Sequence, residues 1–364
     1  MTKVWTAGAV VAGDRVHTPG TVAVHDGQIV DVSAGAAAGA EDLGPDAIIA
    51  PGAIDLHSDA VEKLAEPRPG VRLPFPIAVR ALDSRLHGAG VTTGYAALSL
   101  AGDEIGMRER DATEALAYEL RTLIEPRVEH RLHLRVELTD EPSVRLATEL
   151  LGYRAAAMVS VMNHTPGQGQ FLTTDSYLDF YRRNYAISDH DLVTRIGVKL
   201  AAAPHLDTRL GRLAAAAAEG GIPLAWHDPD SARTVERAHA HGAAVAEFPT
   251  TVEAARSARA AGMAVAMGAP NLLLRRSTSG NLSAVEALAA GALDVLVSDY
   301  YPEAMWPAAL ASGLPLPAAV ALVTSAPARA AGLRDRGTIA PGLRADLVAL
   351  RPDGTVFRTL PSRS

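Results

Sequence analysis

The sequence of 364 residues contains no cysteine. Disulfide bonds, thiolate nucleophiles, iron–sulfur clusters and cysteine-based zinc sites are therefore excluded. Any metal site has to be built from histidine, aspartate and glutamate, and the chain has 12 histidines and 41 acidic residues to supply one.

Lysine is also scarce. Of the 34 basic residues only Lys3, Lys63 and Lys199 are lysine, and the rest are arginine. This excess reflects either genome composition or a small anionic substrate, because arginine binds planar anions in a bidentate manner. The formal net charge of −7 argues against nucleic acid or an anionic membrane as a partner.

Long hydrophobic runs are missing as well. No uncharged apolar stretch reaches the roughly 20 residues of a membrane-spanning helix. Residues 1–15 lack the continuous apolar region of a signal peptide. We therefore expect a cytoplasmic protein with no membrane partner, and a homo-oligomer is left open.

Both ends of the chain have short strand-like segments. Residues 21–25 and 28–32 flank Asp26-Gly27, a strong hairpin signal, and residues 345–350 form another apolar run near the C-terminus. Each end alone is too small to bury a core. We expect residues 1–50 and 332–364 to combine into one small β-sandwich domain.

Residues 51–331 are expected to form the catalytic domain. Apolar strand-like runs occur at 48–57, 91–98, 133–138, 156–164, 222–227, 243–248, 264–269 and 295–300. Helical stretches such as 112–124, 231–241, 252–261 and 283–290 lie between many of them. This alternation predicts an α/β fold, a (β/α)8 TIM barrel. The alternative, a doubly wound sheet, usually carries a glycine-rich phosphate loop, and the sequence contains neither common form of that motif.

In such a barrel the catalytic groups lie at the C-terminal ends of the strands. Six of the eight predicted strands end on histidine or a carboxylate, and alternate residues such as His57 and Asp59 point the same way. We expect one or two divalent ions, zinc first and manganese, iron or cobalt as alternatives, because the donors are nitrogen and oxygen. The predicted metal ligands are His57, Asp59, Glu137, His164, His227 and Asp299.

Individual roles follow from these positions. Glu137 is a candidate bridge between two ions, Asp299 is expected to accept a proton from metal-bound water, and His164 is also assigned a catalytic role. The nine other histidines, His133 among them, are expected to be surface residues or helix caps.

Several motifs resemble a known family. The stretch from Pro51 to His57 is similar to the start of an amidohydrolase-superfamily barrel, which also carries a β-domain built from both termini. More narrowly, the sequence resembles the α-D-ribose 1-methylphosphonate 5-triphosphate diphosphatase family of the phosphonate (carbon–phosphorus lyase) pathway. The motifs are HSD (57–59), EPRPGV (66–71), HTPGQ (164–168), AEFPTT (246–251), MGAPN (267–271), SGN (279–281) and SDYYP (298–302).

The resemblance implies a diphosphatase reaction that converts the ribose 5-triphosphate to the 5-phosphate and pyrophosphate. A metal-activated hydroxide would attack phosphorus, and metals and arginines would neutralise the phosphoryl oxygens. The expected partner is thus a small phosphorylated substrate. The candidate substrate-binding residues are Arg68, Arg72, Gln168, Glu247, Asn271, Arg275, Arg276, Ser279, Asn281 and Tyr300.

Two positions depart from the family's usual pattern. Asn163 replaces an aspartate and Thr278 replaces a histidine, both where substrate is expected. A C–N bond hydrolase of the same superfamily, acting on an amide, a cyclic amide or a deaminable base, is therefore a second hypothesis. Its lysine-bridged subtype is disfavoured because Lys199 falls in a helical stretch. A non-catalytic scaffold is the third hypothesis.

Overall fold

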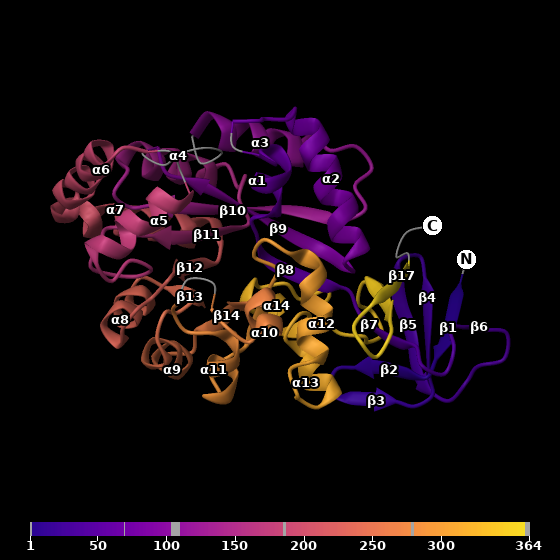
Figure 1. Ribbon diagram of the computed structural model, residues 1–364. Coiled ribbons are helices and arrows are strands. Elements are labelled where there is room, and N and C mark those ends of the chain that lie inside the picture. Colours follow the sequence, from indigo (N-terminus) through magenta and orange to yellow (C-terminus); the bar gives the residue numbers. More distant parts are fainter. Residues whose placement is uncertain (1, 69, 103–109, 185–186, 278–279, 361–364) are drawn as a thin grey trace.

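An eight-stranded parallel sheet forms the centre of the molecule (Figure 1). The structure is a computed structural model, and it describes residues 2–68, 70–102, 110–184, 187–277 and 280–360. The strands follow one another around the sheet in chain order. They are β8 (Ala53–Ser58), β9 (Val91–Leu100), β10 (Glu129–Glu137), β11 (Met158–Met162), β12 (Leu224–His227), β13 (Ala243–Glu247), β14 (Ala264–Gly268) and β15 (Val295–Val297).

The first and last strands of this sheet meet at their C-terminal ends, which closes the barrel. Ser58 and Asp299 form a parallel bridge. The amide of Asp59 donates to the carbonyl of Asp299 at 2.6 Å, and the amide of Asp299 donates to the carbonyl of His57 at 2.9 Å. The buried Asp55 adds a side-chain link, because its Oδ1 accepts from the amide of Ser298 at 2.9 Å. This junction between β8 and β15, the barrel seam, therefore includes residues of the predicted site.

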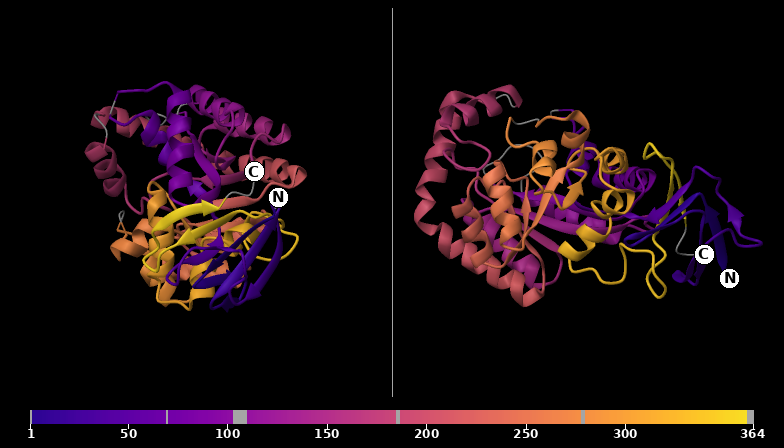
Figure 2. Two further views of the ribbon diagram at one scale, coloured as in Figure 1. Left: turned by 90° about the vertical axis from the view of Figure 1, so that its right-hand side faces the viewer. Right: turned by 90° about the horizontal axis from the view of Figure 1, so that it is seen from below.

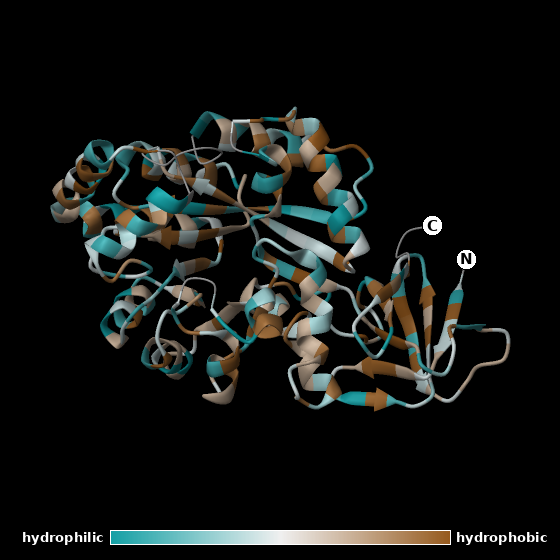
Figure 3. Ribbon diagram, in the orientation of Figure 1, coloured by the Kyte–Doolittle hydropathy of each residue, from teal (hydrophilic) through white to brown (hydrophobic). Residues whose placement is uncertain are grey.

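Helices cover the outside of the sheet (Figure 2), and many of them contain both hydrophilic and hydrophobic residues (Figure 3). Several begin directly after a strand on a capping side chain, such as Asp140, Ser231 and Thr251. The helices are α1 (Ala60–Ala65), α2 (Phe75–Gly88), α3 (Arg110–Thr122), α4 (Glu141–Gly152), α5 (Thr174–Asn184), α6 (Asp189–Ala201), α7 (Leu206–Gly220), α8 (Ala232–Ala240), α9 (Val252–Ala260), α10 (Ala269–Leu274), α11 (Ala284–Ala289), α12 (Met305–Leu310), α13 (Leu316–Ala321) and α14 (Ser325–Ala330). Within the described residues, no helix combines the length and apolarity needed to span a membrane.

Two further sheets lie beside the barrel, and the two ends of the chain lie close together there (Figures 1 and 2). One has the order β5 (Gln28–Ala34), β4 (Gly20–His25), β1 (Lys3–Ala7), β6 (Glu41–Asp42). The other has the order β17 (Val356–Leu360), β16 (Leu347–Leu350), β7 (Ile48–Pro51), β2 (Ala9–Ala12), β3 (Arg15–His17). The α/β barrel with a small β-domain from both termini is thus confirmed, while its bounds at residues 50 and 332 stay a prediction.

The structure refines two local expectations. Asp26 and Gly27 both have positive φ, 48° and 77°, as a two-residue hairpin requires, so the predicted hairpin is present. The predicted strand 48–57 is in fact two strands, β7 in a terminal sheet and β8 in the barrel. Gly52 separates them, and a Cβ there would lie only 2.2 Å from Cγ2 of Thr92.

An ion-pair cluster connects the barrel to the C-terminal segment. Oε2 of Glu129, at the start of β10, accepts from Nη1 of Arg336 at 2.7 Å and from Nη1 of Arg344 at 2.5 Å. Burial alone would raise the pKa of Glu129, but the hydrogen bonds from Arg344 and Arg336 lower it to about 2. The cluster therefore favours the ionised carboxylate.

Candidate metal and active site

A cavity of about 180 Å³ opens at the C-terminal ends of the barrel strands. Five of the six predicted metal ligands line it, and they come from opposite sides of the barrel. They are His57, Asp59, His164, His227 and Asp299. This is the arrangement that the (β/α)8 fold predicts, because parallel strands deliver their last residues to one rim.

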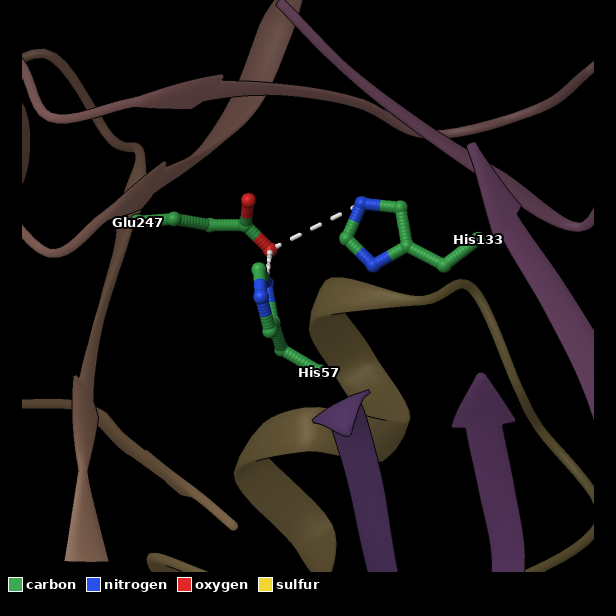
Figure 4. Close-up of side chains that lie close together, drawn as sticks. All are labelled: His57, His133 and Glu247. Atoms are coloured by element: carbon green, nitrogen blue, oxygen red, sulfur yellow. Dashed lines mark hydrogen bonds and ion pairs between the residues drawn. The ribbon is translucent and has the colours of Figure 1, made fainter. Parts of the chain in front are cut away.

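His57 is held by a carboxylate behind it. Its Nδ1 lies 3.2 Å from Oε1 of Glu247, so Nδ1 is the donor (Figure 4). Nε2 in turn lies 3.3 Å from Oδ1 of Asp59. A nitrogen lone pair and a carboxylate oxygen that face each other need a proton or a cation between them.

His164 and His227 repeat this pairing. Nδ1 of His164 lies 2.9 Å from Oε2 of Glu137, and Nδ1 of His227 lies 2.9 Å from Oδ2 of Asp228. Two lone pairs would repel at that distance, so the proton belongs on Nδ1 and Nε2 remains as the ligand atom. Metal-ligating histidines commonly have such a carboxylate partner on the other ring nitrogen.

Glu137 and Glu247 are consequently placed differently from their predicted roles. Neither is among the described residues that line the cavity. Glu137 accepts from the hydroxyl of Thr139 at 2.7 Å and contacts His164, and Glu247 accepts from His57. Both orient a histidine in this structure, while a bridging role for Glu137 and substrate binding by Glu247 stay predictions.

The sequence interpretation of His133 as a surface or capping residue is wrong. His133 is fully buried, and its Nδ1 donates to the carbonyl of Leu56 at 2.8 Å. Its Nε2 lies 2.5 Å from Oγ of Ser160, which donates to Oε2 of Glu247 at 2.5 Å. His133 and His57 therefore point at one carboxylate from two sides (Figure 4). The inward position of His133 was predictable from strand alternation, because residues 133, 135 and 137 share one face of β10.

The charges around the cavity are unbalanced toward the negative. Burial and then the charge of Asp59 raise the pKa of Asp299 to about 7. Burial alone would lower the pKa of His57, but the charge of Glu247 and the hydrogen bond to Asp59 raise it to about 10. The raised pKa values of Asp299 and His57 mean that both groups bind protons more readily when no cation is present, as expected for clustered carboxylates.

The donor set fits a divalent metal ion. Two groups of residues could each hold an ion, because within each group the ligand atoms lie within 4.8 Å of one another. One group is His57, His133 and Glu247, and the other is His164, His227 and Asp228. Imidazole nitrogens and carboxylate oxygens without sulfur suit zinc, manganese, iron or cobalt. The residues placed to hold an ion at the cavity are His57, Asp59, His164, His227 and Asp299.

Only part of the predicted substrate set lies at this cavity. Asn271 and Asn281 line it. Gln168, Tyr300 and the four predicted arginines, Arg68, Arg72, Arg275 and Arg276, are not among the described lining residues. The arginines are exposed. Ser279, like Thr278, lies outside the described residues.

The cation in the cavity wall is Arg135, which the sequence interpretation missed. Arg275 lies at the C-terminal end of α10 with φ of 54°, and Arg72 pairs with Glu66 at 3.6 Å. Arg135 instead lies on the inward face of β10, two residues before Glu137, so only reading back along the strand would have found it.

Two polar residues singled out in the sequence have local partners. Oδ1 of Asn163 accepts from the amide and the hydroxyl of Thr165, at 3.2 and 2.7 Å, which fixes the turn before the His-Thr-Pro-Gly-Gln loop. Lys199 lies in α6, as expected, and is buried with its Nζ 3.6 Å from Oε2 of Glu137.

Comparison with known sequences agrees with this geometry. A sequence model described as the amidohydrolase family matches residues 308–360. Over 311 residues, covering 82% of each chain, the sequence is 38% identical to alpha-D-ribose 1-methylphosphonate 5-triphosphate diphosphatase from Escherichia coli (strain K12). The chain belongs to the amidohydrolase family. The resemblance inferred from the motifs is therefore confirmed.

Solved structures similar to this amidohydrolase support the same fold. N-acetyl-D-glucosamine-6-phosphate deacetylase from Mycobacterium smegmatis matches 100% of the chain and 99% of its own, with a TM-score of 0.58 and 19% identity. Dihydropyrimidinase from Brevibacillus agri matches 96% of the chain and 86% of its own, with a TM-score of 0.61 and 14% identity. At these identities the likeness is one of fold.

Proposed function

We propose that this amidohydrolase is a metal-dependent diphosphatase that converts the 5-triphosphate of a phosphorylated ribose to the 5-phosphate and pyrophosphate. The observation that carries the proposal is where the family motifs lie. Six of the seven motifs contribute residues to the wall of the same cavity. The contributing residues are His57, Asp59, His164, Phe248, Pro249, Met267, Asn271, Asn281 and Asp299.

The proposed chemistry divides between a metal and the chain. A bound divalent ion would supply Lewis acidity toward phosphoryl oxygens and lower the pKa of water. The chain supplies the proton acceptor, Asp299, a buried carboxylate at the cavity. The backbone of Asp299 is tied to His57 and Asp59 across the barrel seam, so its carboxylate keeps a fixed place at the cavity.

Substrate orientation is assigned to the rest of the wall. The amides of Asn271 and Asn281 are placed to donate to phosphoryl oxygens, and Arg135 brings a fixed positive charge. Phe171 and Phe248 form an apolar border, and Phe248 packs against His57 with ring centroids 5.0 Å apart. Excluding water on that side strengthens the polar contacts with the reacting phosphoryl group.

C–N bond hydrolysis is the second candidate, and one observation favours it. The four arginines expected to bind a polyphosphate lie away from the described cavity wall, so less positive charge surrounds the site than the sequence suggested. A non-catalytic scaffold has less support, since five candidate metal donors share one cavity.

A substrate panel tests the choice. Protein loaded with zinc, manganese or cobalt is incubated with ribose 1-methylphosphonate 5-triphosphate, nucleoside triphosphates, a cyclic amide and an N-acetylated sugar phosphate. We expect pyrophosphate release from the ribose triphosphate and no amide cleavage. Amide cleavage without hydrolysis of any phosphoanhydride would reject the diphosphatase proposal and support the C–N hydrolase.

A further inference from the structure

Arg135 lies between two of the residues placed to hold a metal ion. Its side chain is 5% exposed. One guanidinium nitrogen, Nη1, donates to both carboxylate oxygens of Asp59, at 2.9 and 3.0 Å. The other, Nη2, lies 3.1 Å from Nε2 of His227. One planar cation thus spans a carboxylate just after β8 and an imidazole from β12.

These contacts use the same lone pairs that a metal ion would use. The guanidinium group has only donors, so Nε2 of His227 must accept from it. That agrees with the other side of the ring, where Nδ1 faces the carboxylate of Asp228 at 2.9 Å. Both oxygens of Asp59 are likewise directed at Arg135.

We propose that the guanidinium group of Arg135 takes the place of a second metal ion, so that each chain binds one divalent ion rather than two. The positive charge is permanent, because arginine is not deprotonated in proteins. A second ion between Asp59 and His227 would have to displace this buried group and would then lie beside it. His57, His164 and Asp299 also line the cavity and are the other candidate donors.

This inference rests on the metal dependence of the proposed function but not on its substrate. Two sets of residues, each with three ligand atoms within 4.8 Å of one another, would otherwise suggest two ions. Counting metal ions therefore separates the two readings without an activity assay.

The test uses two uncharged replacements, Arg135→Met and Arg135→Gln, in the full chain. Arg336→Met is the matched control: its arginine is equally buried, at 4% exposed, and pairs with Glu129 away from the site. Each protein is stripped with a chelator, saturated with zinc and desalted, and its metal is counted by mass spectrometry. Circular dichroism checks folding.

We expect one ion per chain in the unmodified protein and in Arg336→Met, and two in Arg135→Met and Arg135→Gln. Two tightly held ions in the unmodified protein would overturn the proposal, as would a single ion in both folded Arg135 variants. If neither variant folds, the count in the unmodified chain decides. If the protein releases pyrophosphate but the metal counts differ from those expected, the proposed function stands and this inference is rejected. If the metal counts are as expected but the protein cleaves amides, this inference stands and the diphosphatase function is rejected.

Discussion

Glu247 accepts from Nδ1 of His57 across 3.2 Å, and this contact directs Nε2 of the imidazole toward Oδ1 of Asp59, 3.3 Å away. Ser160 donates to the other carboxylate oxygen of Glu247 at 2.5 Å, and His133 lies behind it. The position of one cavity residue therefore depends on a chain of buried groups that never reach the cavity.

Glu247→Gln should weaken metal binding by roughly 10- to 100-fold, the usual cost of losing a carboxylate behind a metal-ligating histidine. Competition against a chromophoric chelator measures the affinity. Glu253→Gln, at an exposed position on α9, is the control and should bind as tightly as the unmodified protein. Equal affinity for all three proteins would contradict the orienting role of Glu247.

Asp299→Asn should lower kcat by about 10² to 10⁴-fold, because it removes the proposed proton acceptor. The fold should persist, since the backbone bonds to His57 and Asp59 remain and asparagine tolerates the φ of 55° at this position. Steady-state kinetics with thermal unfolding check both statements. A variant with unchanged kcat would exclude Asp299 as the acceptor.

The barrel and its rim were predictable because both depend on short-range patterns. Alternating apolar runs identify parallel strands, and the last residue of each run falls at one edge, which brought His57, His227 and Asp299 together correctly. Arg135 and His133 were not predicted because they lie on the inward face of β10 before its last residue, Glu137, and only the last residues of the strands indicated the site.

The direction of a side chain was less predictable than its position. Glu137 and Glu247 do lie at strand ends, but whether each contacts a metal or a histidine depends on partners from other strands, such as His164 and Thr139. Arginines in loops were harder still, because the course of a loop such as the one after α10 follows from tertiary packing.

Acid should destabilise the protein through Glu129. Its pKa is about 2 in the folded chain, below its ordinary value of 4.5, so its contribution is complete above about pH 4.5 and is lost as the pH falls toward 2. Glu129→Gln should lower the free energy of unfolding by about 1–3 kcal/mol at pH 7. The variant should also lose less unfolding free energy than the unmodified protein when the pH is lowered.

Urea unfolding at pH 7 and at pH 3 measures this effect. Glu236→Gln, at an exposed position on α8, should unfold like the unmodified protein. If Glu129→Gln and the unmodified protein lose equal stability between the two pH values, the ion-pair cluster does not contribute as proposed.

Removing metal should abolish turnover and lower the unfolding temperature, because an ion bound only by the folded chain stabilises it. At an ion concentration of 100 times Kd that stabilisation is about 2.7 kcal/mol. Calorimetry before and after dialysis against a chelator measures the change, and added zinc, manganese or cobalt should restore both properties. Full activity in exhaustively stripped protein would contradict metal dependence.

The most direct test of the central claim is phosphorus NMR of the products from ribose 1-methylphosphonate 5-triphosphate, with metal-loaded protein and with Asp299→Asn as the impaired control. We expect pyrophosphate and ribose 1-methylphosphonate 5-phosphate in equal amounts from the first time point, and formation of both about 10²-fold or more slower with the control. Stepwise release of orthophosphate, or no cleavage by protein shown to hold its metal, would contradict the diphosphatase function.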